Sequence, residues 1–159
     1  MQRRSGGFSL IEILIVVIIM AIIAAIVLPQ YHGITAQAGQ STLKENLAII
    51  RAQLQMYRNQ HEGFPHANSF AAEMTYFTDI SGNWSETRDG EHAYGPYLER
   101  MPMNTLTSNR GVRGVTGAAS TFSPPAVNAG WWYNESTGEI RPDLADTVVD
   151  DTGTRCNQY

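Results

Sequence analysis

The 159-residue sequence contains a single cysteine, Cys156. One cysteine cannot form a disulfide within the chain, so the class of small secreted proteins held together by several disulfides is excluded. An extracytoplasmic location is still allowed. Basic residues are also scarce in the second part of the chain, where residues 60–159 contain six Arg against thirteen Asp or Glu. Because no basic cluster is interleaved with aromatic residues, the sequence does not predict a nucleic-acid surface.

The common motifs of catalysis are also missing. No glycine-rich loop is followed by Lys-Ser or Lys-Thr, and no serine lies in a G-x-S-x-G turn. His61, Glu62 and His66 do not have the H-E-x-x-H spacing of zinc peptidases, and Gly63 and Pro65 interrupt the helix that this motif needs. We therefore predict an exposed turn at this position, no catalytic residues and no enzyme activity.

Metal binding has only weak support. The acidic residues near the end of the chain could supply oxygen ligands for calcium, but they lack an EF-hand pattern; they are Asp143, Asp146, Asp150 and Asp151. A solvated acidic tail is the favoured interpretation. His92 has no evident partner, and nothing near Cys156 would lower the pKa of its thiol. We predict no metal site and no cofactor, with calcium as the weaker alternative.

The most informative feature is a run of twenty-one residues, 8–28, that is apolar at all but two positions. About twenty apolar residues span a bilayer as a helix, so the run predicts a single transmembrane helix. One of the two exceptions is Glu12. An ionised Glu inside a membrane costs roughly 2.5–3.5 kcal/mol, which makes Glu12 a functional candidate. Arg3 and Arg4 precede the run and the next cation is Lys44, so the N-terminus is predicted to face the cytoplasm.

The junction between the short basic leader and this run indicates a cleavage site. A cut between Gly7 and Phe8 would create an amine one helical turn from Glu12, in the same chain or in a neighbour. The segment Gly7-Phe8-Ser9-Leu10-Ile11-Glu12 resembles the class III signal of type IV pilins and type II secretion pseudopilins. The resemblance implies that a prepilin peptidase cuts after Gly7 and methylates Phe8. It also implies that Glu12 meets the N-terminal amine of an adjacent subunit during assembly.

Three other interpretations of the run compete. A buried helix of a soluble protein is disfavoured by an apolar run of this length. A secretory signal peptide could be cut after Ala36-Gln37-Ala38, but its apolar core would be longer than the usual seven to fifteen residues or so and would contain Glu12. A plain membrane anchor fits the length of the run. It explains neither Glu12 nor the Gly-Phe junction.

After the run, a helical pattern continues towards residue 59. Leu43, Leu47, Ile50, Leu54 and Tyr57 recur at steps of four and three residues, which predicts one apolar stripe on an amphipathic helix. A proline is unfavourable inside a helix by about 3 kcal/mol, so Pro29 predicts a kink between the two halves. Proline at this position also resembles the family. Gly63, with Pro65 close behind, is expected to end the helix.

The remaining residues predict an α+β head. The segment 69–78 has apolar residues at helical spacing, with Asn68 or Ser69 as its cap. Residues 130–134 and 138–141 predict a β-hairpin, and 112–115 a further strand within a long loop. The predicted organisation is a cleaved leader 1–7, a transmembrane helix 8–28, an amphipathic stem 29–59 and a globular head 60–159. The fold class is a long N-terminal helix packed on a small antiparallel β-sheet.

A second stretch resembles the major pseudopilin. Gly95-Pro96-Tyr97-Leu98, followed by Met101-Pro102, is similar to the GPYL…P stretch of that group. The segment 103–109 lacks the Asp and Trp that follow in the family, so this chain departs from the family's calcium loop. The resemblance implies a structural subunit of a helical pseudopilus that supports protein export.

The same resemblance implies a set of partners and a location. The partners are further copies of the chain, a prepilin peptidase, an inner-membrane assembly platform, minor pseudopilins and membrane lipid. The location is the bacterial inner membrane, crossed once, with the head in the periplasm or outside. The alternatives are a type IV pilus pilin, serving adhesion, motility or DNA uptake, and a membrane-anchored ectodomain that binds sugars or carries enzyme activity.

Overall fold

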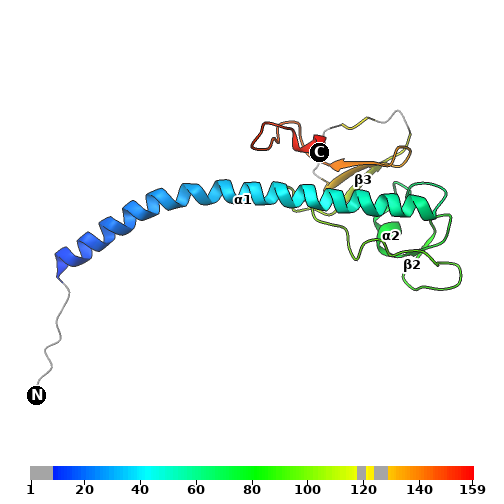
Figure 1. The fold of residues 1–159 in the computed structure, drawn as a ribbon, viewed down its shortest axis with the longest axis horizontal. Coiled ribbons are helices and arrows are strands. Elements are labelled where there is room, and N and C mark those ends of the chain that lie inside the picture. The colour runs from blue at the N-terminus through cyan, green and yellow to red at the C-terminus, as the bar shows by residue number, and fades with distance from the viewer. Residues whose placement is uncertain (1–8, 118–120, 124–128) are drawn as a thin grey trace, which may run out of the picture. The chain divides into compact units, whose positions relative to one another are not determined.

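The computed structural model describes residues 9–117, 121–123 and 129–159, and of residues 27–35 it describes the backbone only. Gly7 and Phe8 therefore lie outside the described residues. The chain divides into two compact units, Met1–Ala38 and Gly39–Tyr159. Helix α1, Leu10–Gln60, contributes residues to both units, so the second half of the predicted stem belongs to the same unit as the head (Figure 1).

The second half of α1 carries the predicted apolar stripe. Its five stripe residues are at most 2% exposed and form one side of the core: Leu43, Leu47, Ile50, Leu54 and Tyr57. Burying an aliphatic or aromatic side chain stabilises a fold by about 1.5–3 kcal/mol. The charged residues predicted to lie off the stripe, such as Glu45 and Arg58, are exposed. This prediction is confirmed.

Helix α1 is assigned as helix through Pro29 and ends at Gln60, before Gly63. The end of the helix confirms the prediction, whereas the kink at Pro29 stays a prediction. No helix among the described residues is both long enough and apolar enough to cross a membrane. Residues 8, 27 and 28 of the predicted span 8–28 are among those whose side chains are not described.

The short helix predicted over 69–78 is present as α2, Phe70–Thr75. It ends early because Phe77–Thr78 is strand β1, which pairs antiparallel with β2, Trp84–Ser85. Ser69 occupies the cap position, but its hydroxyl makes no cap hydrogen bond to the backbone. It donates instead to the Glu73 carboxylate at 2.5 Å.

A three-stranded sheet completes the head, in the order β3-β4-β5 (Figure 1). The predicted hairpin is confirmed: β4, Trp131–Asn134, pairs antiparallel with β5, Glu139–Pro142. Strand β3, Val112–Val115, is parallel to β4, so the sheet is mixed rather than wholly antiparallel. A parallel pair needs a long crossover connection, and the segment between residues 115 and 131 supplies it. The α+β class is confirmed.

The core lies between α1, α2 and β4. Trp131 and Tyr133 are fully buried, and the Tyr133 ring lies 4.3 Å from that of Phe70 in α2. The Gly95-Pro96-Tyr97-Leu98 stretch docks on the end of α2, where the backbone N–H groups of Tyr97 and Leu98 donate to the Met74 carbonyl at 3.1 and 2.8 Å. The last helix is a 3-10 helix, Cys156–Gln158, and it packs against this core through Cys156.

Candidate assembly site

The site with the strongest signal in the sequence begins at the first turn of α1. Ser9 precedes the helix, and its carbonyl accepts from the backbone N–H of Glu12 at 3.0 Å and of Ile13 at 3.3 Å. In return, Oε2 of Glu12 accepts from the backbone N–H of Ser9 at 2.8 Å. This is the reciprocal half of a capping box, whose sequence signature is Ser-x-x-Glu. The sequence predicts that Glu12 pairs with an N-terminal amine, in its own chain or in a neighbour, whereas the same four residues also encode this contact with the backbone.

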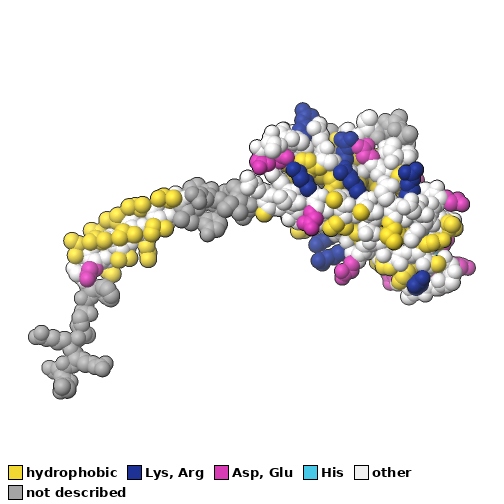
Figure 2. All heavy atoms as spheres, in the orientation of Figure 1, with side chains coloured by type: hydrophobic (Ala, Val, Ile, Leu, Met, Phe, Trp, Pro, Cys, Tyr) yellow, Lys and Arg dark blue, Asp and Glu magenta, His cyan; other side chains and the backbone are white. Residues whose placement is uncertain are grey.

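The helix beyond Glu12 is covered with exposed apolar side chains (Figure 2). Every large apolar residue between Leu10 and Ile26 is at least 47% exposed, so no face of this segment is buried against its own chain. Contiguous apolar surface of this kind marks a protein or membrane interaction site. Glu12 is the one charged residue in this segment. A carboxylate at the start of a helix is favoured by the helix dipole by about 0.3–1 kcal/mol.

The described part of the structure does not test the other predicted site residues. Gly7 and Phe8 lie outside the described residues, so their cleavage, the methylation of Phe8 and its contact with Glu12 stay predictions. The side chain of Pro29 is likewise not described.

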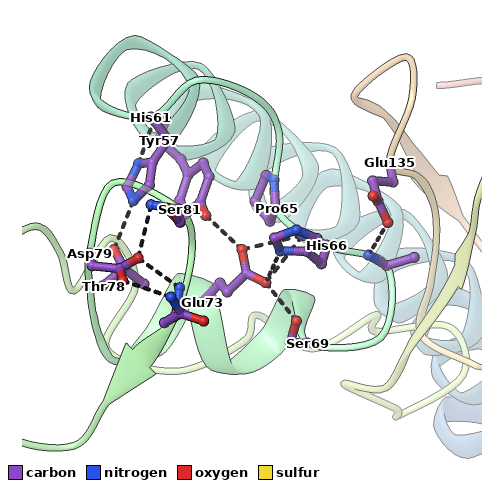
Figure 3. Close-up of polar contacts among 12 residues, drawn as sticks. Tyr57, His61, Pro65, His66, Ser69, Glu73, Thr78, Asp79, Ser81 and Glu135 are labelled. Atoms are coloured by element: carbon purple, nitrogen blue, oxygen red, sulfur yellow. Dashed lines mark hydrogen bonds and ion pairs between the residues drawn. The ribbon is translucent and has the colours of Figure 1, made fainter. Parts of the chain in front are cut away.

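A buried polar network lies at the other end of α1, where sequence reasoning had expected an exposed turn (Figure 3). The Glu73 carboxylate is fully buried and accepts from the hydroxyl of Tyr57 at 2.6 Å. It also contacts Nδ1 of His66 at 2.9 Å and accepts from the backbone N–H of His66 at 3.2 Å. Burial, then the hydrogen bond to Glu73, raises the pKa of Tyr57 far above its usual value. Sequence reasoning missed Glu73, because nothing in a helix of six residues marks a buried carboxylate.

The prediction of exposure was wrong for His61, which is 8% exposed. Its ring stacks on that of Tyr57 at 3.7 Å, and its Nε2 lies 3.0 Å from the hydroxyl of Thr78. A hollow of about 480 Å³ lies beside these rings and is also lined by Glu62 and Glu135. The polar atoms of His61 and Glu73 are occupied by partners from their own chain, so the network holds the end of α1 to α2 and β1.

The acidic tail is not uniformly solvated, which corrects the prediction. Asp143 is fully buried and forms an ion pair with Arg113 of β3 at 2.5 Å. Asp150 is 7% exposed and accepts from the backbone N–H groups of Thr152 and Thr154, both at 2.9 Å. Hydrogen bonds, first that of the Thr152 hydroxyl, hold the pKa of Asp150 well below its usual value. The partner of Asp143 lies thirty residues away in the sequence, whereas the backbone donors to Asp150 lie only two and four residues along the chain.

His92, for which no partner was expected, lies against Asp89, with its Nδ1 2.9 Å from Oδ1. Within the described ranges, no three His, Cys, Asp or Glu side chains come close enough together to hold a metal ion. Calcium binding stays a weak prediction. Cys156 is fully buried, and its Sγ lies 3.4 Å from the hydroxyl of Tyr159.

Similarity to known proteins supports a functional role for the start of α1, where Glu12 lies. A family profile described as the prokaryotic N-terminal methylation motif matches residues 2–28. Type II secretion system core protein G of Klebsiella pneumoniae is 24% identical over 108 residues, covering 68% of this chain and 74% of that protein. The protein of the same name from Pseudomonas aeruginosa is 42% identical over 66 residues, covering 41% of this chain and 46% of that protein. The second match thus spans less than half of its relative.

A third relative matches over most of the chain. The type IV major pilin protein PilA of Myxococcus xanthus is 38% identical over 154 residues, covering 90% of this chain and 68% of that protein. No solved structure matches the chain. The methylation motif coincides with the capped, apolar start of α1, and the similarity to PilA extends over the head. The chain therefore belongs to the family of type IV pilins and type II secretion pseudopilins.

Proposed function

We propose that this chain is the repeating structural subunit of a helical filament, the pseudopilus of a type II secretion system, and that it supports protein export. The observation that carries the proposal is the exposed apolar surface of α1 from Leu10 to Ile26, with Glu12 at its start. In a filament, copies of this segment would cover one another's apolar surfaces. The relatives named core protein G support the same role. The role is structural, and no residue is assigned to catalysis.

The proposal includes a membrane-bound stage. Before assembly, the run 8–28 anchors the chain in the bacterial inner membrane with its leader in the cytoplasm and its head exported. The prepilin peptidase cuts between Gly7 and Phe8 and methylates Phe8. Glu12 then exchanges its contact with the Ser9 N–H for the amine of Phe8 in an adjacent subunit, which sets the axial register. A carboxylate and an amine are each poorly solvated in lipid, so pairing them favours assembly.

Two other partners follow from this role. One is an inner-membrane assembly platform that adds subunits, and the other is a set of minor pseudopilins in the same filament. A pilus pilin is the second candidate, because the similarity to the Myxococcus pilin covers 90% of this chain. The two candidates share the subunit architecture and differ in the machine that the filament serves. Deleting the chain's gene separates them, since loss of protein export supports the pseudopilin and loss of surface pili or motility supports the pilin.

The central test compares filament formation by the wild-type chain and by Glu12→Ala. Filaments are counted by electron microscopy at equal membrane levels, and intact-mass measurement confirms that each chain begins at Phe8. We expect Glu12→Ala to be inserted and cleaved but to form few filaments. A mature chain that retains Met1, or that starts near Gly39, contradicts the proposal, as do wild-type filament numbers from a cleaved Glu12→Ala chain.

A further inference from the structure

A shallow groove of about 340 Å³ lies on the head between α1 and the segment 98–103. Ile49 of α1 lines it and is 42% exposed, and the nearly buried Leu98 and Met101 line it from the other side. The same flank of α1 continues to Met56, 50% exposed, at a second hollow of about 220 Å³. Exposed apolar side chains gathered around a groove are typical of a surface that another protein covers.

Two arginines on this groove have no acidic partner among the residues that the structure describes. Arg100 and Arg110 line the groove and are exposed, and neither forms an ion pair within the part of the chain that the structure describes. Four other cations each contact a carboxylate: Lys44, Arg113, Arg141 and Arg155. Glu99 also lines the groove, so the two arginines and this glutamate give the groove a net charge of plus one. An apolar groove with unpaired cations at its rim fits a partner that presents an apolar tip beside carboxylates.

The hairpin of β1 and β2 presents such a tip. Ile80 in its turn is 51% exposed, and Trp84 in β2 is 46% exposed. The Trp84 ring is stacked on that of Tyr76, with centroids 5.3 Å apart. Asp79 holds the turn rigid, because its carboxylate accepts from the backbone N–H groups of Ser81 and Asn83, both at 2.9 Å. A rigid aromatic tip loses little conformational entropy on docking.

Carboxylates follow this tip directly. The segment 86–91 contains Glu86, Asp89 and Glu91 against one cation, Arg88. Glu86 and Glu91 are exposed, and among the described residues neither takes part in an ion pair. The tip therefore combines apolar and acidic groups, whereas the groove combines apolar and basic groups.

We propose that the tip of one copy of this chain, Ile80 with Trp84, docks in the groove of a second copy at Ile49. Glu86 and Glu91 of the first copy then lie beside Arg100 and Arg110 of the second. The inference rests on the proposed filament function and adds a contact between heads to the packing of the α1 segments. Because two different surfaces meet, a docked pair still has one free groove, on the first copy, and one free tip, on the second. A heterologous contact of this kind builds an open helical array when its rotation does not close a ring.

The test reverses charge on one surface and then on the other, in the full-length chain. Arg100→Glu with Arg110→Glu places like charges together, and we expect filament numbers to fall at least about tenfold, because like charges facing each other across an interface oppose docking. Adding Glu86→Arg and Glu91→Arg to the same chain restores complementarity in every contact, and filament numbers should recover. The control is Arg155→Glu, which reverses the charge of one arginine outside both surfaces. Its partner Asp146 is as exposed as Arg155 itself, so this variant should form filaments normally.

A crosslinking measurement covers the case in which a charge variant does not fold. Two full-length chains, one with Ile49→Cys and one with Ile80→Cys, are expressed together, and their filaments are oxidised. We expect a disulfide between the two chains, and none when Val149→Cys, 48% exposed and outside both surfaces, replaces Ile80→Cys. Filaments without the Ile49–Ile80 crosslink, or with undiminished numbers after groove reversal, overturn the docking but leave the proposed function intact. A wild-type chain that forms no filaments overturns the proposed function itself.

Discussion

The hydroxyl of Tyr57 donates a 2.6 Å hydrogen bond to the carboxylate of Glu73, and both side chains are at most 2% exposed. The bond joins the last turns of α1 to α2. The buried carboxylate also accepts from the Ser69 hydroxyl and from the backbone N–H of His66. Removing one donor therefore leaves fewer hydrogen bonds to offset the desolvation of the carboxylate. The end of the long helix is thus attached to the head by a polar contact as well as by the apolar stripe.

Tyr57→Phe tests this attachment. The change removes one hydrogen bond to a buried charged group and keeps the ring, so we expect a loss of about 1.5–3 kcal/mol in the free energy of unfolding. Thermal unfolding of the full chain in detergent, followed by circular dichroism, measures it. The control is Tyr94→Phe, a half-buried tyrosine whose ring packs near His61. Equal losses from the two variants would contradict a special role for the Tyr57 hydroxyl.

Asp150→Asn should lower stability in a pH-dependent way. Hydrogen bonds hold the pKa of Asp150 in the folded chain below its usual value, which is about 3.9 in an unfolded chain. A carboxyl group whose pKa is lower in the folded than in the unfolded chain stabilises the fold at pH values above the unfolded pKa. This stabilisation is lost as the pH falls from the unfolded pKa through the folded pKa. The difference in Tm between wild type and Asp150→Asn should therefore be largest near pH 7 and shrink towards pH 3. The exposed Glu99→Gln serves as control, and a pH-independent difference would contradict the explanation.

Cys156 is predicted to contribute through packing and not through a disulfide. Its side chain is fully buried, so Cys156→Ser places a hydroxyl in the core and should cost on the order of 1 kcal/mol, moderated by the nearby Tyr159 hydroxyl. From the sequence alone we would expect no loss. Adding a reductant to the wild-type chain should leave its Tm unchanged. A Tm that falls with reductant would reveal a disulfide between chains.

Glu12→Gln separates the local role of Glu12 from its proposed role in assembly. Glutamine at this position of a capping box can still accept from the Ser9 N–H, so the start of α1 is preserved. The negative charge is lost, and with it the proposed attraction to the Phe8 amine. We expect Glu12→Gln to be cleaved and inserted like wild type but to assemble as poorly as Glu12→Ala. Filament numbers close to wild type would show that the cap, rather than the charge, is what Glu12 supplies.

The elements that were predicted correctly are those encoded by neighbours in the sequence. The steps of four and three residues from Leu43 to Tyr57 determine which face of the helix is apolar, whatever it packs against. The hairpin around residues 135–138 depends on strand-forming residues beside a short polar turn. The Gly7–Phe8 junction and Glu12 are also local features of the sequence, and the cleavage and assembly roles inferred from them stay predictions.

Only the tertiary structure decided which polar groups are buried and which way β3 runs. Buried Asp143 is paired with Arg113, which lies in β3, thirty positions earlier in the sequence. Glu135 accepts from the backbone N–H of Ala67, sixty-eight positions away, and His61 is covered by Tyr57 and the strands after α2. A carboxylate or imidazole in a polar stretch carries no local signal of burial. The free-energy cost of burying such a group depends on hydrogen-bond partners that only the folded chain brings near. The parallel pairing of β3 with β4 is likewise a contact between segments far apart in the sequence, which no local pattern encodes.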